Sequence, residues 1–364
     1  MQVLEVRNVH DALLRGLELL EVHGITRDSR NGLVREATSP VTTVYHRPQE
    51  KVLFWDQRDA NPFFHFMEGL WMLGGRYDLD YVYQFNKGMK RYSDDGQTLH
   101  GAYGWRWRSY FTRHHGKTRN FELKDWSEED PDYIDQLAII IKRLKDDPQD
   151  RRSVLQMWDP ILDLDRDGKD VPCNTTIYFK IDSDRRLQMT VCNRSNDIIW
   201  GAYGANAVHM SMLQEYMAGA LNVSVGKYYQ VSDNYHAYKE VFDKLVDKFM
   251  DIDAFDFYTM KSLINSNPYL IGDYDNKITP YPMVNATIED WDLDLLKFLG
   301  RTPFQKGIGY NDPFFVDVAE PIQDAWWHWK LDEHEEAILE IAKCEASDWR
   351  KVCWDWFSRR LNKE

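Results

Sequence analysis

The sequence predicts an α+β protein, in which a mixed sheet is packed by helices and followed by a helical C-terminal extension. Strand-like and helix-like segments follow one another without the regular alternation that a doubly wound fold shows. The chain has 364 residues, with 43% hydrophobic and 29% charged residues, as in ordinary globular proteins. Aromatic residues make up 14% of the chain, which argues against extended disorder.

The N-terminal part is predicted to combine helices with short strands. Apolar residues at helical spacing predict a helix over 9–22, and a Val-, Thr- and Tyr-rich stretch over 41–54 predicts two strands with a turn at Arg47-Pro48. Pro62 suits the first turn of a helix, and Gly74-Gly75 suits its end.

The central part is predicted to alternate irregularly between exposed segments, helices and strands. Residues 111–132 are polar and predict an exposed excursion. The elements expected after it are a helix over 133–144, a strand over 154–158, strands over 175–181 and 187–192, and helices over 205–221 and 236–250.

The composition changes towards the C-terminus. From Pro321 onward the pattern is helical and rich in tryptophan, including Trp326, Trp349 and Trp356. We therefore expect a large domain over 1–303 and a Trp-rich helical extension over 304–364.

Charge and hydropathy exclude several classes of protein. The net charge of -14 argues against a broad nucleic-acid-binding face, although a few local arginines still suffice for one small anion. No apolar run is long enough for a membrane span, and no secretory signal pattern is present, so we expect a cytoplasmic protein without membrane contact. The Cys residues lack CxxC spacing, which makes a zinc site or disulfide framework improbable.

Cys173 is the first candidate for chemistry. A lone cysteine beside a strand is usually a small buried hydrophobe. Here Arg151-Arg152 precede it and Arg194-Ser195 follow it, each at about twenty residues. Arginine lowers the pKa of a nearby thiol and grips phosphate with its planar fork. A nucleophilic thiolate acting on a phosphorylated substrate is therefore the functional interpretation.

Four further residues are candidates, each with a simpler structural explanation. Asn206 begins a predicted helix and is either an N-cap or an amide that recognises a base. His236 and Tyr238 precede a predicted helix and are two residues apart, so both can face one pocket. Glu68 lies on an apolar helix and is either at a wet helix edge or a buried proton relay.

Together these blocks resemble the thymidylate synthase family, which includes the pyrimidine-nucleotide hydroxymethylases. The resemblance rests on order and spacing over roughly residues 30–295. The matching blocks are Arg151-Arg152 through Trp158-Asp159-Pro160, Pro172-Cys173, Arg194-Ser195-x-Asp197, Gly201 to Asn206 and His236-x-Tyr238, preceded by Glu68 to Gly75 and Gly101-Ala-Tyr103-Gly104-x-Arg106.

The resemblance implies a fold of that family and a role for each matching residue. Cys173 would attack C6 of the pyrimidine, Glu68 and Tyr103 would serve proton transfer, and Asp197 would hold the folate. The co-substrate would be 5,10-methylenetetrahydrofolate, and an obligate homodimer would share its arginines between subunits. The substrate-binding residues would be Arg194 and Ser195 with Arg151 and Arg152 of the partner subunit at the phosphate, Arg30 (alternatively Arg27) completing that cage, Asn206 at the base, and His236 and Tyr238 at the sugar.

Departures from the synthase pattern favour hydroxymethylation over methylation. Asn174 follows the nucleophile where synthases have His, so we include Asn174 among the catalytic residues. The tryptophans expected near the folate are replaced by residues such as Met89 and Tyr92, and the closing tail is replaced by an extension. The leading expectation is conversion of dUMP to 5-hydroxymethyl-dUMP. Thymidylate synthase, a dCMP or CMP hydroxymethylase, and a catalytically inactive nucleotide-binding homologue are the alternatives.

Overall fold

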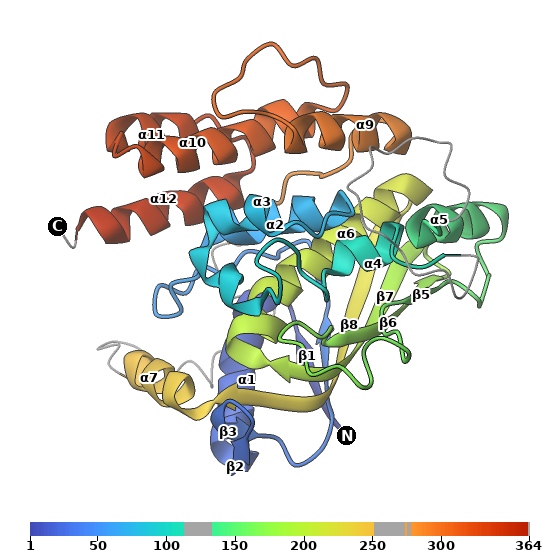
Figure 1. Cartoon of the computed structure of the whole chain (residues 1–364), viewed down its shortest axis with the longest axis vertical. Helices are drawn as coiled ribbons and strands as arrows, with labels where there is room; N and C mark the ends of the chain where they lie inside the picture. Colours follow the sequence, from blue (N-terminus) through green and yellow to red (C-terminus); the bar gives the residue numbers. More distant parts are fainter. Residues whose placement is uncertain (113–132, 251–273, 275–277, 363–364) are drawn as a thin grey trace.

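A computed structural model describes residues 1–112, 133–250, 274 and 278–362. Its centre is a mixed sheet with the strand order β1-β4-β8-β7-β6-β5, and a hairpin of β2 and β3 joins it through β8 (Figure 1). The strands are β1 (Gln2–Val6), β2 (Ile25–Ser29), β3 (Gly32–Glu36), β4 (Val41–Tyr45), β5 (Val154–Gln156), β6 (Asn174–Ile181), β7 (Arg186–Asp197) and β8 (Ser224–Tyr238).

The pairing of β7 with β8 organises the sheet. These two strands are parallel, with Asn193 opposite Ser232 and Asp197 opposite His236. The pairs β6/β7 and β3/β8 are antiparallel, so the sheet is mixed. Parallel neighbours end at the same edge of a sheet, and the C-terminal ends of β7 and β8 therefore bring two candidate motifs together.

Helices cover one side of the sheet in two layers (Figure 1). The inner layer contains α2 and α6, which contact each other, and α6 also contacts β7 and β8. The helices are α1 (Val9–His23), α2 (Pro62–Leu73), α3 (Leu79–Phe85), α4 (Tyr103–Arg108), α5 (Gln136–Asp146), α6 (Asn206–Leu221), α7 (Lys239–Met250), α9 (Ile288–Leu299), α10 (Glu320–Lys330), α11 (His334–Ile341) and α12 (Ser347–Leu361).

Helix α2 shows how local chemistry sets an element's ends. The Asn61 side chain caps the first turn by accepting a hydrogen bond from the Phe64 amide at 3.1 Å, and Pro62 occupies a first-turn position that needs no amide donor. The helix ends at Gly74, and Gly75 has a φ of 68°. All residues of α2 are buried, Glu68 included.

The C-terminal helices pack their tryptophans against α2. The ring centroids of Phe63 and Trp326 are 5.4 Å apart, and those of Phe66 and Trp349 are 4.9 Å apart. Trp356 also lies against Phe63, at 5.5 Å. These tryptophans thus form packed helix faces that share one hydrophobic core with the rest of the chain. The domain boundary at residue 303 stays a prediction.

Two predicted elements are wrong. The second strand of 41–54 is absent, because Val52, Leu53 and Phe54 are buried in the core as irregular chain and form no ladder. The helix expected from His236 begins only at Lys239, because β8 continues through Tyr238 while pairing with β7 and β3.

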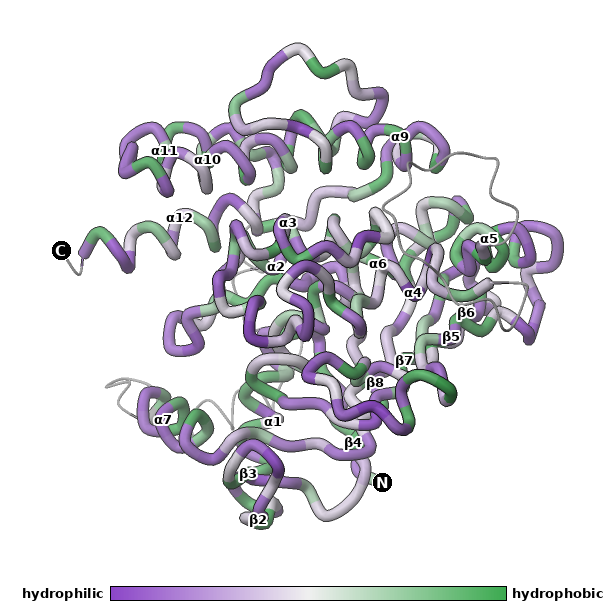
Figure 2. The backbone as a smooth tube through the Cα atoms, viewed as in Figure 1, coloured by the Kyte–Doolittle hydropathy of each residue, from purple (hydrophilic) through white to green (hydrophobic). Residues whose placement is uncertain are grey.

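Most other elements are confirmed to within a few residues. Helix α5, for example, is predicted over 133–144 and observed over Gln136–Asp146. Its alternating hydropathy is visible in Figure 2 and matches a buried face formed by Leu137, Ile140, Ile141 and Leu144. Most of the excursion over 111–132 lies outside the described residues. Within the described ranges, no helix is long and apolar enough to cross a membrane.

Candidate active site

Cys173 directly precedes strand β6 and faces Arg194 on the neighbouring strand β7. The Arg194 amide donates to the Cys173 carbonyl at 3.0 Å, and Arg194 Nη2 lies 4.0 Å from Cys173 Sγ. The guanidinium is fixed by the carbonyls of Pro172 and Val171, both at 3.0 Å. The thiol and a conformationally restrained cation therefore share one site.

The thiol is not a thiolate in the free chain. Burial raises the pKa of Cys173 above its ordinary value of 9.0, while the positive charges of Arg194 and Arg30 act in the opposite direction. The sequence-based expectation of a lowered pKa is therefore wrong for the free chain, because desolvation outweighs the two arginines. A base has to remove the thiol proton when the nucleophile acts.

Glu68 projects from α2 into the same region. Burial raises the pKa of the Glu68 carboxyl from 4.5 to about 8, and the negative charge of Asp170 adds to this. His209 Nε2 lies 3.3 Å from Glu68 Oε2. Because burial lowers the pKa of His209 to about 3, this contact joins two neutral groups and is not an ion pair. Glu68 thus holds a proton at neutral pH and can release it near pH 8.

Tyr103, at the start of α4, lies against the nucleophile. Its hydroxyl lies near the backbone amides of Cys173 and Asn174, which act to lower the pKa of the phenol. Burial nevertheless raises the pKa of Tyr103 well above 10.0, so the phenol stays protonated. The structure brings together three of the predicted catalytic residues, Cys173, Tyr103 and Asn174.

Asn174 is completely buried, yet its side chain has no hydrogen-bond partner among the described residues. Both Asn174 Oδ1 and Asn174 Nδ2 lack one, as does Oδ1 of Asn193, which lies opposite Asn174 on β7. Buried polar groups are normally paired, and an unpaired one costs about 1–3 kcal/mol. This concentration of unpaired polar atoms indicates a place where a ligand or water is meant to bind.

Asn206 begins α6 and is oriented by a short relay of polar side chains. Asn206 Nδ2 donates to Asn196 Oδ1 at 3.3 Å, and Asn196 Nδ2 donates to Ser232 Oγ at 3.0 Å. Asn196 and Ser232 are both buried. The Asn206 amide therefore retains a free acceptor and one further donor, as base recognition requires.

Asp197 lies at the end of β7 and caps the segment that leads to Asn206. Asp197 Oδ1 accepts hydrogen bonds from the amides of Ile199 and Trp200 at 2.8 and 2.7 Å. Burial raises the pKa of Asp197, while the backbone amides and His236 act against the rise. Trp200 is 52% exposed beside this carboxylate and offers a flat apolar surface to solvent.

The β2–β3 hairpin brings Arg30 to the site. Its neighbour Asn31 donates from Nδ2 to the Tyr238 hydroxyl at 3.2 Å, and the Tyr238 and His236 rings stand 5.8 Å apart. Arg30 is also close enough to lower the pKa of the Cys173 thiol. Arg27 instead pairs with Glu36 at 3.1 Å, which favours Arg30 of the two alternatives.

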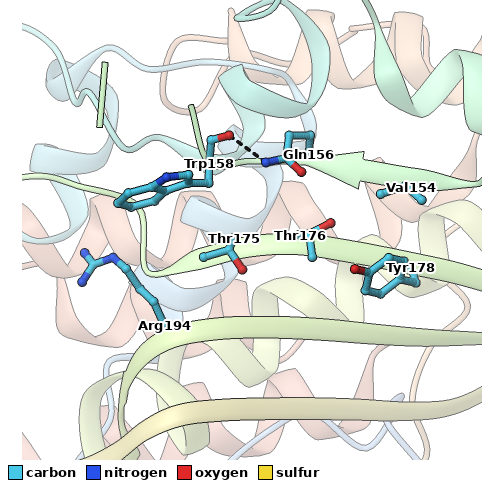
Figure 3. A pocket seen from close by; sticks show the side chains of 7 residues that line it. All are labelled: Val154, Gln156, Trp158, Thr175, Thr176, Tyr178 and Arg194. Carbon is cyan, nitrogen blue, oxygen red and sulfur yellow. Dashed lines mark hydrogen bonds between the residues drawn. The ribbon is translucent and has the colours of Figure 1, made fainter. Parts of the chain in front are cut away.

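Arg151 and Arg152 are placed differently from the other arginines. Both are exposed in front of β5, and Arg152 pairs only loosely with Asp150, at 3.5 Å. Strand β5, which follows them in the chain, contributes to a shallow open hollow of about 420 Å³ on the outer face of the sheet (Figure 3). Val154, Gln156, Trp158, Thr175, Thr176, Tyr178 and Arg194 line it.

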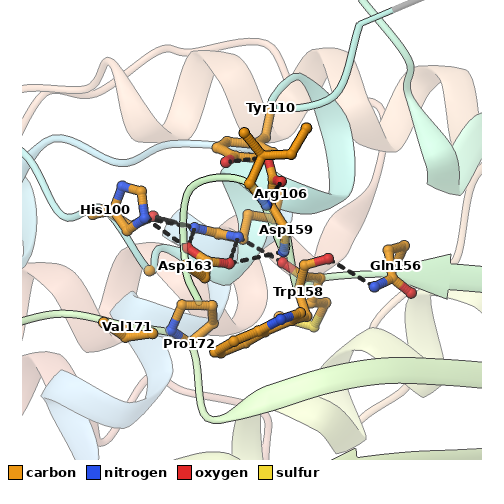
Figure 4. Close-up of polar contacts among 12 residues, drawn as sticks. His100, Arg106, Tyr110, Gln156, Trp158, Asp159, Asp163, Val171 and Pro172 are labelled. Carbon is orange, nitrogen blue, oxygen red and sulfur yellow. Dashed lines mark hydrogen bonds and ion pairs between the residues drawn. The ribbon is translucent and has the colours of Figure 1, made fainter. Parts of the chain in front are cut away.

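A buried ion-pair network supports the loop that leads to Cys173. Arg106 on α4 is fully buried and pairs with Asp163 at 2.7 Å and with the Met157 carbonyl at 2.6 Å (Figure 4). His100 Nε2 contacts Asp163 at 2.8 Å. Burial acts to raise the pKa of Asp163, but hydrogen bonds from His100 and Arg106 lower it to about 2.

Several site residues escape sequence reasoning. Asp170 is half-buried near Glu68 and Cys173 and accepts a hydrogen bond from the Gly101 amide at 2.8 Å. Asp170 lies three residues before the cysteine in a loop with several other aspartates, so the sequence does not distinguish it from exposed carboxylates. Asn196 and Ser232 carry no sequence signal, because their contact depends on the register of β7 and β8.

The comparisons with known proteins agree with this geometry. Residues 23–275 match the model of the family described as thymidylate synthase. The chain belongs to the thymidylate synthase family. It is 46% identical to a deoxyuridylate hydroxymethyltransferase of Pseudomonas phage M6, over 99% of this chain and 95% of that relative.

Other members of the thymidylate synthase family are more distant. A deoxyuridylate hydroxymethyltransferase of Bacillus phage SP01 is 31% identical, over 72% of this chain and 64% of that relative. A putative thymidylate synthase of Methanosarcina acetivorans is 26% identical, over 66% of this chain and 92% of that relative. The expected family and the α+β fold class are thereby confirmed.

Proposed function

We propose that this enzyme transfers a one-carbon unit to C5 of dUMP and releases 5-hydroxymethyl-dUMP. The observation that carries this proposal is the similarity to the M6 phage deoxyuridylate hydroxymethyltransferase, which extends over 99% of the chain and includes the C-terminal helices. The asparagine after the nucleophile supports the same choice, because it offers a polar group where water is needed.

The nucleotide would bind between the ends of β7, β8 and the β2–β3 hairpin. Arg194, Ser195 and Arg30 would bind the phosphate, which suits the bidentate geometry of guanidinium groups. His236 and Tyr238 would hold the sugar. Asn206 would donate to uracil O4 and accept from N3–H, leaving its second amide hydrogen on Asn196.

Cys173 would add to C6 of the ring and so make C5 nucleophilic. The thiol needs a base at that moment, since burial raises its pKa in the free chain. Arg194 at 4.0 Å stabilises the thiolate that forms. Glu68, with a pKa of about 8, can return a proton to the substrate, and the protonated Tyr103 can donate a hydrogen bond beside the thiol.

Asn174 would hold the water that completes the hydroxymethyl group. Its amide is buried and has no hydrogen-bond partner in the described part of the chain, so it can both accept from a water and donate to it. Before this step C5 bonds to the methylene carbon of the folate, loss of the C5 proton and cleavage of the carbon–nitrogen bond release tetrahydrofolate, and an exocyclic methylene remains at C5. Addition of that water to this carbon forms the new C–O bond and gives one proton to solvent, and elimination of Cys173 restores the ring double bond. A methylating enzyme would have to keep water out of the same position.

The one-carbon unit would come from 5,10-methylenetetrahydrofolate as co-substrate. Asp197 is half-buried, and its carboxylate lies near the exposed ring of Trp200, a set of groups that suits a flat heterocycle with N–H donors. We assign Asp197 to hold that heterocycle.

We also propose that the active form is a homodimer. Two apolar side chains that line the hollow in Figure 3 are exposed on the outer face of the sheet, Val154 to 40% and Tyr178 to 46%. A second copy related by a twofold axis would cover this face and bring its own Arg151 and Arg152 to the phosphate. Among the residues that the structure describes, Arg194 and Arg30 are the arginines that act on the Cys173 thiol within one chain.

The product identifies the reaction. The purified enzyme is incubated with dUMP and methylenetetrahydrofolate, the nucleotide product is identified by mass spectrometry and the folate product by absorbance. We expect 5-hydroxymethyl-dUMP together with tetrahydrofolate. Thymidylate together with dihydrofolate would instead show a thymidylate synthase, and turnover of dCMP in preference to dUMP would show a cytosine-specific enzyme.

A further inference from the structure

Helix α12, in the C-terminal part of the chain, makes polar contacts with a turn that lies just before α2 in the sequence. The turn comprises Trp55–Asp59, where the amides of Arg58 and Asp59 donate to the carbonyls of Trp55 and Asp56 at 3.1 and 3.0 Å. We call it the 55–59 turn. Asp59 has a φ of 44°, in the left-handed region, so the turn holds an unusual backbone geometry.

Two arginines of α12 bind both carboxylates of the 55–59 turn. Arg359 pairs with Asp56 and with Asp59, the latter at 3.2 Å. Arg360 binds Asp59 in a bidentate way, at 3.1 and 3.2 Å, and its guanidinium stacks 3.6 Å above the Trp356 ring. A shared, bidentate network of this kind is stronger than isolated surface pairs.

Arg58, between these two aspartates, points the other way and reaches the active site. Its Nε donates to the Ile199 carbonyl at 2.9 Å, and its guanidinium lies 4.3 Å from the centre of the Trp200 ring. Only 8% of Arg58 is exposed. The contacted residues belong to the 197–205 segment, which connects Asp197 to Asn206.

The 197–205 segment needs such external support. Its backbone departs from helical geometry at Tyr203 and Gly204, and a Cβ at Gly204 would lie 2.9 Å from the Ile199 carbonyl oxygen. Asp197 caps its start, Arg58 binds the Ile199 carbonyl, and sheet residues hold Ala202 and Tyr203. Ile199 and Trp200, which lie next to Asp197, are thus the part of the segment that Arg58 helps to position.

We propose that α12 is a positioning element of the active site, which acts through the 55–59 turn and the positioning residue Arg58 on the 197–205 segment. The consequence rests on the proposed function, because Asp197 and Trp200 are assigned there to the folate. Loss of the α12 contact should loosen the folate side of the site. Arg194 and Ser195, which the β-sheet holds, should keep their grip on the nucleotide.

The test reverses the charges on α12 in the full-length enzyme. The variant R359E/R360E repels Asp56 and Asp59, and the control K330E/K343E reverses two charges elsewhere in the same extension. Coupling of this kind is worth about 0.5–2 kcal/mol, or roughly 2- to 30-fold. We expect the KM for methylenetetrahydrofolate to rise within that range in R359E/R360E alone, while the Kd for dUMP changes by less than about twofold.

A reciprocal exchange separates positioning from general damage. R359E should raise the folate KM, and D56K/R359E should restore it, because the pair is re-formed with opposite polarity. The proposal would be overturned if R359E/R360E and K330E/K343E had the same folate KM. It would also be overturned if R359E/R360E lost as much affinity for dUMP as for the folate, or if D56K did not rescue R359E. Failure of the wild-type enzyme to turn over dUMP would instead refute the proposed function, so the two failures are distinguishable.

Discussion

At the scale of single residues, burial dominates the electrostatics of the site. It keeps Glu68 protonated at neutral pH and raises the pKa of the Cys173 thiol despite two nearby arginines. It also leaves the Asn174 amide without partners among the described residues. Glu68 and Cys173 are therefore uncharged at neutral pH, and Asn174 has hydrogen-bonding groups to offer, before the ligands bind beside the arginines.

The raised pKa of Glu68 predicts a pH dependence of stability. Between the ordinary value of 4.5 and about 8, the folded chain keeps a proton that the unfolded chain loses. The free energy of unfolding should therefore fall as pH rises across this interval, at up to about 1.4 kcal/mol per unit. Urea denaturation of the wild type and Glu68→Gln at several pH values should show the wild type losing stability relative to the variant from pH 5 to 8, because the glutamine does not titrate. A constant difference would contradict the assignment.

The orientation of Asn206 predicts base specificity. Asn206→Asp removes the donor to uracil O4 and provides an acceptor for the cytosine amino group. It should lower kcat/KM for dUMP by roughly 10²- to 10³-fold and raise the ratio of dCMP to dUMP turnover. Asn206→Ala is the control, since it loses dUMP recognition without gaining dCMP. An unchanged ratio in Asn206→Asp would show that this side chain does not read the base.

At the scale of elements, the site is assembled where secondary structures end. Cys173 directly precedes β6, Asp197 ends β7, Tyr103 begins α4 and Asn206 begins α6. Residues at the ends of helices and strands have polar groups that can bind a ligand, while the packed parts of each element fix the positions of these groups.

The Arg106 network predicts a stability cost for the loop before Cys173. Arg106→Leu leaves the buried Asp163 carboxylate without its main partner, which should lower the free energy of unfolding by about 3–5 kcal/mol. Adding Asp163→Asn removes the buried charge and should recover part of that loss. Urea denaturation of both variants checks this. A double variant less stable than Arg106→Leu would argue against an ion-pair origin.

Sequence patterns predict the residues of the active site better than the residues that hold them in position. Cys173, Arg194 and Asn206 are evident from ordered motifs, and most helices and strands follow from periodicity. The helix expected at His236 fails because sheet pairing, a long-range effect, overrides the local pattern. Arg58 and Asn196 are invisible in the sequence, since their partners lie on distant elements brought together only by the fold.

At the scale of the whole molecule, the aromatic surplus of the chain has a structural use. Trp326, Trp349 and Trp356 cover α2, the helix that carries Glu68, so the C-terminal helices complete the core behind the active site. On the opposite face of the sheet, Val154 and Tyr178 remain exposed beside Arg151 and Arg152. The helical side is thus closed, and the sheet side is available to a second copy.

The proposed homodimer predicts complementation between two inactive variants. Cys173→Ala lacks the nucleophile, and Arg151→Ala/Arg152→Ala lacks the arginines offered to the partner. After unfolding and refolding together, random pairing should leave about a quarter of the sites intact, because one site in each mixed dimer takes both groups from different chains. Activity assays of the mixture, with each variant refolded alone as control, measure this. No recovery, with mixed dimers present, would rule out shared sites.

In the proposed reaction water completes the product, and the origin of one oxygen atom tests this step. The reaction is run with dUMP and methylenetetrahydrofolate in water enriched in heavy oxygen, and the nucleotide product is examined by mass spectrometry. We expect a hydroxymethyl group that carries the heavy oxygen, and a slower reaction in Asn174→Leu, which lacks both polar groups. A methyl product without solvent oxygen would contradict it.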